Sequence, residues 1–222
     1  MRFYFHPSPN PMKVALLLSE LELPFETIAV DIFKGAQHEP EFRKLNPNGK
    51  VPVLVDEDIT VFDSHAILLY LAEKQGRFLA TAPRARAATL SWLEFVATGL
   101  SPFSGQAVHF LHYAPEPVPY AKNRYFKEVE RHYQVLDARL AESPFLGGNE
   151  YSIADIALWG WARGAGYIFG EQGLEKYPQV RKLVEAISAR PAATRATQLA
   201  ANLTLKTEFD EETRRALFPQ NL

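Results

Sequence analysis

The sequence predicts an α/β domain with the element order βαβ-α-ββα, followed by an all-α helical bundle. Up to about residue 75, short β-rich runs alternate with segments in which apolar residues recur at helical spacing. Beyond about residue 84 the helical spacing continues and no convincing strand follows. We therefore expect a first domain at residues 1–77, a linker at 78–83, a helical domain at 84–203 and a C-terminal tail at 204–222.

The first domain opens with a predicted βαβ unit. Residues 2–6 favour a strand, residues 12–23 carry apolar side chains at helical spacing, and residues 25–30 favour a second strand. Such units are nearly always right-handed with parallel strands. A short helix is expected at residues 39–45.

A predicted hairpin and a helix complete this domain. Two β-rich runs, 51–55 and 59–62, are separated by three acidic residues, which is typical of a tight hairpin. A helix is expected from Ser64 to about Gln75, with Asp63 or Ser64 as its N-cap. The resulting order is that of a thioredoxin-like domain, a four-stranded mixed sheet with helices on both faces.

Helices are also expected at 84–113, 120–142, 152–169 and 177–189. Ser152 and Asp155 have the spacing of a capping box at the start of the third of these helices. Residues after about 201 are polar and suggest a weakly held tail.

Composition narrows the classes of function. The 222 residues carry a net charge of −2, so nothing electrostatic favours binding to nucleic acid or to an anionic membrane. No apolar run is long enough for a membrane span and no signal-peptide pattern opens the chain, so we expect a cytoplasmic protein. The chain has no cysteine, which excludes a protein disulfide, a zinc–thiolate site and a catalytic thiol.

The hairpin contains features that suggest a ligand. If the Val51–Pro52 bond is cis, the N–H and C=O of Val51 would face outward to an extended, peptide-like molecule. Ser64 at the start of a helix offers a site for a carboxylate, and Asp63 could hold an ammonium group. The alternative is a proline at the start of a strand followed by an ordinary N-cap.

The chain closely resembles the cytosolic glutathione transferases over about residues 2–200. The motifs that carry the resemblance are Asn46-Pro-Asn-Gly-Lys-Val-Pro-Val-Leu, Asp63-Ser-His-Ala-Ile-Leu-Leu-Tyr-Leu and Asn149-Glu-Tyr-Ser-Ile-Ala-Asp-Ile-Ala. Finer features, such as Ser8-Pro9-Asn10 and Lys34-Gly-Ala-Gln37, are similar to the bacterial Nu class of glutathione-dependent disulfide reductases.

The resemblance implies that glutathione, reduced or oxidised, is the co-substrate, with no metal. Its contacts would come from the catalytic candidates Ser8 and Asn10, and from the binding residues Gln37, Lys50, Val51, Pro52, Asp63, Ser64 and Arg124. The class usually has Thr in place of Ser8 and Glu in place of Asp63. The shorter Asp63 could therefore contact the γ-glutamyl head through water.

With no protein cysteine, the expected chemistry is thiol–disulfide exchange between glutathione molecules and a disulfide substrate. Hydrogen bonds from Ser8 and Asn10 would lower the pKa of the bound thiol. Three alternatives stay open: conjugation to a small electrophile, peroxide reduction, and a non-catalytic glutathione-binding regulatory protein. Ser8 and Asn10 could also be simple helix caps.

Further expectations concern the helical domain. Phe103, Gln106, Phe110 and Tyr167 are candidates for a second-substrate pocket, although aromatics at these spacings also fit a core. His109 and His112 share a helical face but lack a third metal ligand at a suggestive spacing. The resemblance implies a homodimer, with Arg84, Arg86 and Trp92 near the contact.

Overall fold

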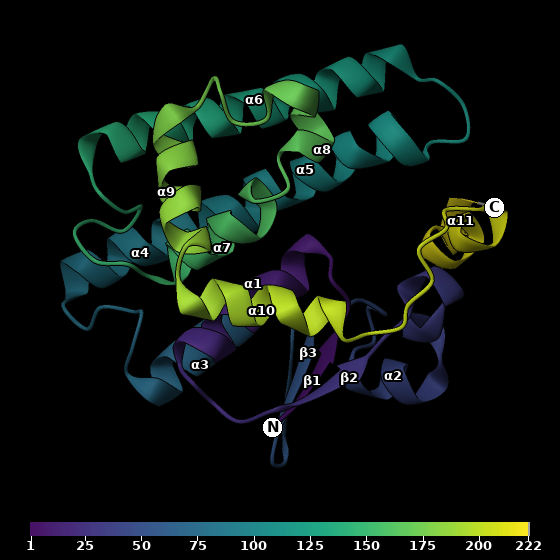
Figure 1. The fold of residues 1–222 in the computed structure, drawn as a ribbon, viewed down its shortest axis with the longest axis horizontal. Coiled ribbons are helices and arrows are strands. Elements are labelled where there is room, and N and C mark those ends of the chain that lie inside the picture. The colour runs from purple at the N-terminus through teal and green to yellow at the C-terminus, as the bar shows by residue number, and fades with distance from the viewer. Residues whose placement is uncertain (222) are drawn as a thin grey trace. The chain divides into compact units, whose positions relative to one another are not determined.

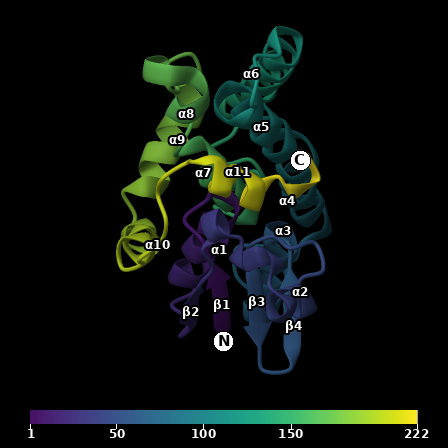
Figure 2. The same ribbon diagram turned by 90° about the vertical axis from the view of Figure 1, so that its right-hand side faces the viewer.

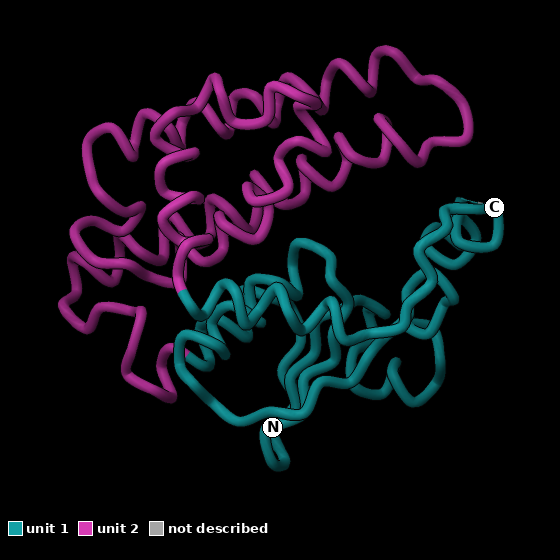
Figure 3. Tube along the Cα trace, viewed as in Figure 1, with its two compact units in different colours: residues 1–71, 191–222 teal, residues 72–190 magenta. Residues whose placement is uncertain are grey.

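The structure is a computed structural model and describes residues 1–221. The chain forms two compact units, Met1–Leu71 with Pro191–Leu222, and Ala72–Arg190 (Figure 3). Among residues 1–221 there is no helix with the length and apolar character needed to cross a membrane.

A four-stranded mixed sheet forms the centre of the first unit. The strands are β1 (Arg2–Phe5), β2 (Glu26–Ala29), β3 (Val53–Asp56) and β4 (Ile59–Phe62). They stand side by side in the order β2-β1-β3-β4 (Figure 2). β1 pairs parallel with β2 and antiparallel with β3, and β3 pairs antiparallel with β4. The mixed sheet expected from the sequence is confirmed.

The helices of this unit are α1 (Pro9–Glu20), α2 (Pro40–Leu45) and the larger part of α3 (Ser64–Gln75), whose residues from Ala72 on belong to the second unit. The 3₁₀ turns η1 (Ile32–Lys34) and η2 (Ala36–His38) lie between β2 and α2 (Figure 1). α1 begins three residues earlier than predicted. Pro9 and Pro11 lie in its first turn, where a helix needs no N–H from them, so the prolines start the helix instead of delaying it.

Side chains of β1 alternate between two cores. Phe3 and Phe5 are fully buried on one face of the sheet. Tyr4 points to the other face, where it packs against a cluster that includes Phe42 of α2, at a ring distance of 5.9 Å. Successive side chains of a strand point to opposite faces of the sheet, so a strand that lies between two layers buries side chains on both faces.

The C-terminal segment differs from the expected tail. The residues predicted as a tail form α11 (Glu211–Leu217) and η6 (Pro219–Asn221). They pack within the first unit, as does α10 (Pro191–Ala201), which was expected in the helical domain. Arg195 of α10 donates to the carbonyl of Ser19 in α1 at 2.8 Å, and Thr213 of α11 is fully buried. The polar composition misled the prediction, because the apolar partners of this segment lie more than 150 residues earlier in the chain.

The second unit is helical and contains no strand among its described residues. Its elements are α4 (Pro83–Phe95), the π-helical turn η3 (Val96–Leu100), α5 (Ser101–Val108), the π-helical turn η4 (His109–Tyr113), α6 (Pro119–Glu142), α7 (Ile153–Ala162), α8 (Gly166–Phe169), η5 (Gly170–Gln172) and α9 (Pro178–Ser188). The predicted helix at 84–113 is therefore one run with a π turn in its middle and a second π turn at its end.

The predicted capping box at the start of α7 is confirmed. The Ser152 hydroxyl accepts from the N–H of Ala154 at 3.3 Å, and the Asp155 carboxylate accepts from the N–H of Ser152 at 2.9 Å. Asp155 also accepts from the N–H of Leu146 at 2.8 Å. The start of α7 is thus tied to the preceding turn, and the helix is buried on nearly all sides.

Candidate functional site

The strand register brings four loops to one edge of the sheet. Phe5 at the end of β1 pairs with Ala29 at the end of β2. On the other side of β1, Tyr4 pairs with Val53 at the start of β3, and Val53 pairs with Phe62 at the end of β4. The segments that follow β1, β2 and β4 therefore meet the segment that precedes β3. Ligands of open α/β sheets bind at such edges.

Ser8 follows β1 at this edge. Its backbone is extended and it occupies the N-cap position of α1, but its side chain makes no capping hydrogen bond. The simple-cap alternative therefore does not hold for the Ser8 hydroxyl. Asn10 lies within the first turn of α1 and is partly buried.

Val51 and Pro52 precede β3. The Val51–Pro52 peptide bond is cis, as the sequence analysis considered. Neither backbone group of Val51 makes a hydrogen bond with any of the described residues. The loop itself is held from the other side, because the Asn46 side chain donates to the carbonyl of Lys50 at 2.6 Å.

Asp63 and Ser64 join β4 to α3. Asp63 has a positive φ of 72°, and its Oδ1 accepts from the N–H of His65 at 2.8 Å, so Asp63 is the N-cap of the helix. The other carboxylate oxygen of Asp63, Oδ2, takes no part in capping the helix. Ser64 is 4% exposed in the first turn of α3, next to the positive end of the helix dipole.

A buried lysine beneath this helix start was missed by the sequence analysis. Lys13 of α1 is fully buried and its Nζ lies 2.8 Å from Nε2 of His65. Burial lowers the pKa of Lys13 to about 7, and the charge of Asp63 works in the opposite direction. The one sequence feature that could have indicated this burial is the position of Lys13 among the apolar residues of α1. Such a feature is weak, because long lysine side chains usually reach solvent.

Gln37 belongs to the segment that follows β2. Its side chain is 4% exposed, and its Nε2 donates to the carbonyl of Ala216 in α11 at 3.0 Å. Lys50, by contrast, is exposed. No local pattern around Gln37 indicates that it is buried beneath a C-terminal helix.

The remaining predicted site residues lie in the second unit. The ring of Phe110 stacks on that of Tyr125 with a centroid distance of 5.4 Å, and Phe103 lies against Tyr125 and His132. Arg124 lies over the Phe103 ring at 5.9 Å and pairs with Glu128 at 3.1 Å. The role of these residues in binding stays a prediction, as it does for the exposed Gln106.

Tyr167 and His112 form a small surface cluster, whereas His109 lies against Phe110. Tyr167 stacks on His112 at 4.1 Å, and the His112 ring nitrogen lies 2.7 Å from the Tyr167 carbonyl. Within residues 1–221 no group of three or more His, Cys, Asp or Glu side chains has the arrangement of a metal site.

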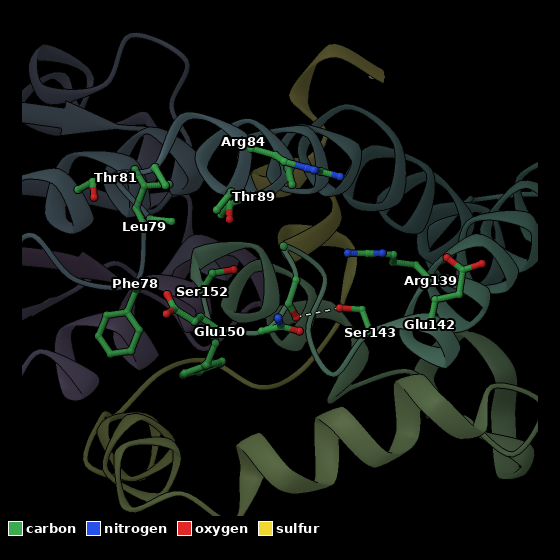
Figure 4. Close-up of a pocket in the computed structure, with 18 of the residues that line it drawn as sticks. Phe78, Leu79, Thr81, Arg84, Thr89, Arg139, Glu142, Ser143, Glu150 and Ser152 are labelled. Atoms are coloured by element: carbon green, nitrogen blue, oxygen red, sulfur yellow. Dashed lines mark hydrogen bonds between the residues drawn. The ribbon is translucent and has the colours of Figure 1, made fainter.

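A cavity of about 1000 Å³ also lies in the second unit. Its walls come from the residues before and within α4, the end of α6 and the turn before α7 (Figure 4). Arg84 and Arg139 line it together with Glu142 and Glu150, so its charges balance. None of the predicted glutathione contacts lines this cavity.

Comparisons with known proteins agree with this arrangement. Residues 1–73 match the family model for the glutathione S-transferase N-terminal domain, and residues 101–191 match that for the C-terminal domain. The disulfide-bond oxidoreductase YfcG of Escherichia coli (strain K12) is 48% identical over 200 residues, which cover 87% of this chain and 92% of YfcG.

Solved structures are similar as well. The glutathione transferase URE2P6 from Phanerochaete chrysosporium, in complex with oxidised glutathione, superposes with a TM-score of 0.85 and 35% identity, covering 91% of this chain and 97% of that one. A glutathione transferase family member from Pseudomonas fluorescens with two glutathione molecules bound gives a TM-score of 0.84 and 35% identity, covering 88% and 91%. On the strength of the two domain matches and the identity to YfcG, the chain belongs to the glutathione S-transferase family.

Proposed function

We propose that this protein is an enzyme that reduces disulfide bonds with glutathione as its co-substrate. The observation that carries the proposal is the Ser8 hydroxyl, which lies at the ligand-binding edge of the sheet and is not used to cap α1. Support also comes from YfcG, a relative named as a disulfide-bond oxidoreductase. The absence of cysteine from the chain requires that both reacting sulfurs come from ligands.

The sheet edge is long enough to hold an extended tripeptide. Neighbouring strands are about 4.8 Å apart, so the four strand ends span about 14 Å. An extended tripeptide spans about 10 Å. The unpaired backbone of Val51 would pair with the central residue of glutathione in the manner of strand addition.

The γ-glutamyl head would lie at the start of α3. Ser64 and the helix dipole suit its carboxylate, and Oδ2 of Asp63 suits its ammonium group. Gln37 and Lys50 would contact the rest of the molecule, and Arg124 is a further predicted contact. These assignments rest on the residue types, on the register and on the resemblance.

The chemistry we propose is direct exchange. The bound glutathione thiolate attacks the glutathione sulfur of a mixed disulfide, forming one S–S bond and breaking another. Glutathione disulfide forms, and the substrate leaves as a thiolate that takes a proton from water. A free thiol titrates near 8.5, so lowering its pKa by two units requires about 2.7 kcal/mol of preferential stabilisation of the thiolate. Hydrogen bonds from Ser8 and Asn10 would supply it.

Two measurements test the proposal. Calorimetry should detect binding of reduced or oxidised glutathione at millimolar concentration, and absence of heat with both would refute it. Turnover of a glutathione mixed disulfide should exceed turnover of a chloronitrobenzene electrophile. The reverse ranking would instead indicate conjugation, and binding without turnover would indicate a regulatory protein.

The finer properties are proposals of the same kind. We place the protein in the Nu class, in the cytoplasm and in a homodimer, because the sequence motifs resemble that class and its members. The residues expected near the dimer contact, Arg84, Arg86 and Trp92, all lie on α4.

A further inference from the structure

The C-terminal segment covers the residues around Gln37. We call residues 204–221 the C-terminal strap. Its helix α11 packs on η1 (Figure 1), and Phe209 meets Phe33 edge to face at 6.4 Å. The backbone N–H of Lys206 donates to Oδ2 of Asp31 at 2.9 Å. The strap therefore binds the turns that follow β2 through both apolar and polar contacts.

The carbonyl of Ala216 is the point at which the strap meets the predicted ligand contact. Arg43 can only donate, so Nδ1 of His38, 3.2 Å from its guanidinium, is an acceptor. Nε2 of His38 therefore carries the ring proton and donates to the Ala216 carbonyl at 2.7 Å. Gln37 Nε2 donates to the same oxygen at 3.0 Å. Two neighbouring side chains thus share one acceptor supplied by the strap.

The contact with Ala216 determines which polar groups of the Gln37 amide are paired and which are not. One amide hydrogen is taken by Ala216, and Oε1 is buried without a hydrogen-bond partner among the described residues. An unpaired buried acceptor is unfavourable by about 1–3 kcal/mol, so the orientation suits a ligand that supplies the missing donor. The peptide N–H groups of glutathione are donors of this kind.

We propose that the C-terminal strap is a positioning element for glutathione, which fixes the Gln37 amide in the orientation that meets the ligand. This inference rests on the proposed function. Holding a long polar side chain in one rotamer before binding removes about 0.5–1.5 kcal/mol of ordering cost, which corresponds to about two- to tenfold in affinity. Because the strap does not include Ser8 or Asn10, it acts on affinity and not on the chemical step.

The test separates affinity from turnover. Phe209→Ala, which removes the contact with Phe33, and a chain that ends at Leu203 should each raise KM for glutathione about two- to tenfold and leave kcat at saturation nearly unchanged. Arg215→Ala is the matched control, because among residues 1–221 the recorded partner of Arg215 is Glu211, on the exposed side of α11. It should leave KM unchanged.

A double-mutant cycle shows whether the strap acts through Gln37. In a Gln37→Ala background, Phe209→Ala should raise KM no further. Full additivity, unchanged KM in a folded strap variant, or tighter binding after strap removal would each overturn the inference. If the full-length chain neither binds nor turns over glutathione, the proposed function has failed instead, so the two failures are distinguishable.

Discussion

Nζ of Lys13 lies 2.8 Å from Nε2 of His65, and both side chains are buried beneath the start of α3. The two residues are 52 positions apart in the sequence. His65 is also tied to the N-cap, because its N–H donates to Asp63. The pair therefore connects α1, which begins next to Ser8, to the helix start proposed to bind the γ-glutamyl head.

Lys13 should give the stability of the protein a measurable pH dependence. Burial lowers its folded pKa to about 7, whereas an unfolded lysine titrates near 10.4. Between these values the unfolded chain binds more protons, so the free energy of unfolding rises with pH, and below pH 7 the folded state carries the full cost of the charge.

The variant Lys13→Met should lack this dependence. Relative to it, the wild-type protein should gain about 2 kcal/mol of unfolding free energy from pH 7 to pH 9, measured by urea denaturation. Lys44→Met, at an exposed position, serves as the control. If the free energy of unfolding changed with pH in the same way for the wild-type protein and for Lys13→Met, the lowered pKa of Lys13 would be contradicted.

The Ser8→Ala, Asn10→Ala double variant should reduce mixed-disulfide turnover at least about tenfold at pH 7, because returning the thiol pKa by about two units to 8.5 lowers the thiolate fraction from about three quarters to about 3%. The ultraviolet absorbance of the bound thiolate, followed against pH, should shift accordingly. Glutathione binding should persist, because Val51 and Ser64 are unchanged. An unaltered turnover rate would remove both residues from the mechanism.

Asp155→Ala should destabilise the helical unit. The carboxylate accepts hydrogen bonds from the N–H groups of Leu146 and Ser152 and from the Ser152 hydroxyl, so its loss leaves buried donors unpaired. We expect the free energy of unfolding to fall by about 3 kcal/mol in denaturant titrations. Glu185→Ala, on the exposed surface of α9, should change it by less than about 0.5 kcal/mol.

Gly99→Ala should also destabilise this unit, for a steric reason. A Cβ at Gly99 would overlap the ring of His132, which is buried and held by a 2.7 Å hydrogen bond from Nδ1 to the Glu128 carbonyl. Overpacking of this kind lowers the free energy of unfolding by about 1–3 kcal/mol. In a His132→Ala background the same change should have little effect, and equal losses in both backgrounds would refute the overlap.

Much of the first unit follows from patterns that are local in the chain. The turn before Val51, the alternation of the hairpin strands and the caps at Asp63 and Ser152 each depend on residues a few positions apart. The strand order then follows from the βαβ rule and the hairpin, which is why the sheet edge with Ser8, Val51 and Ser64 could be anticipated.

The sequence by itself determined the mixed sheet, the helical second unit and the absence of any protein sulfur from cysteine, because spacing and composition depend on near neighbours alone. Only the tertiary structure decided that Lys13 is buried against His65 and that the strap covers Gln37. These contacts join residues 52 and 179 positions apart. No periodicity in the sequence records them, since they arise from burial and hydrogen bonding between segments that meet only after folding.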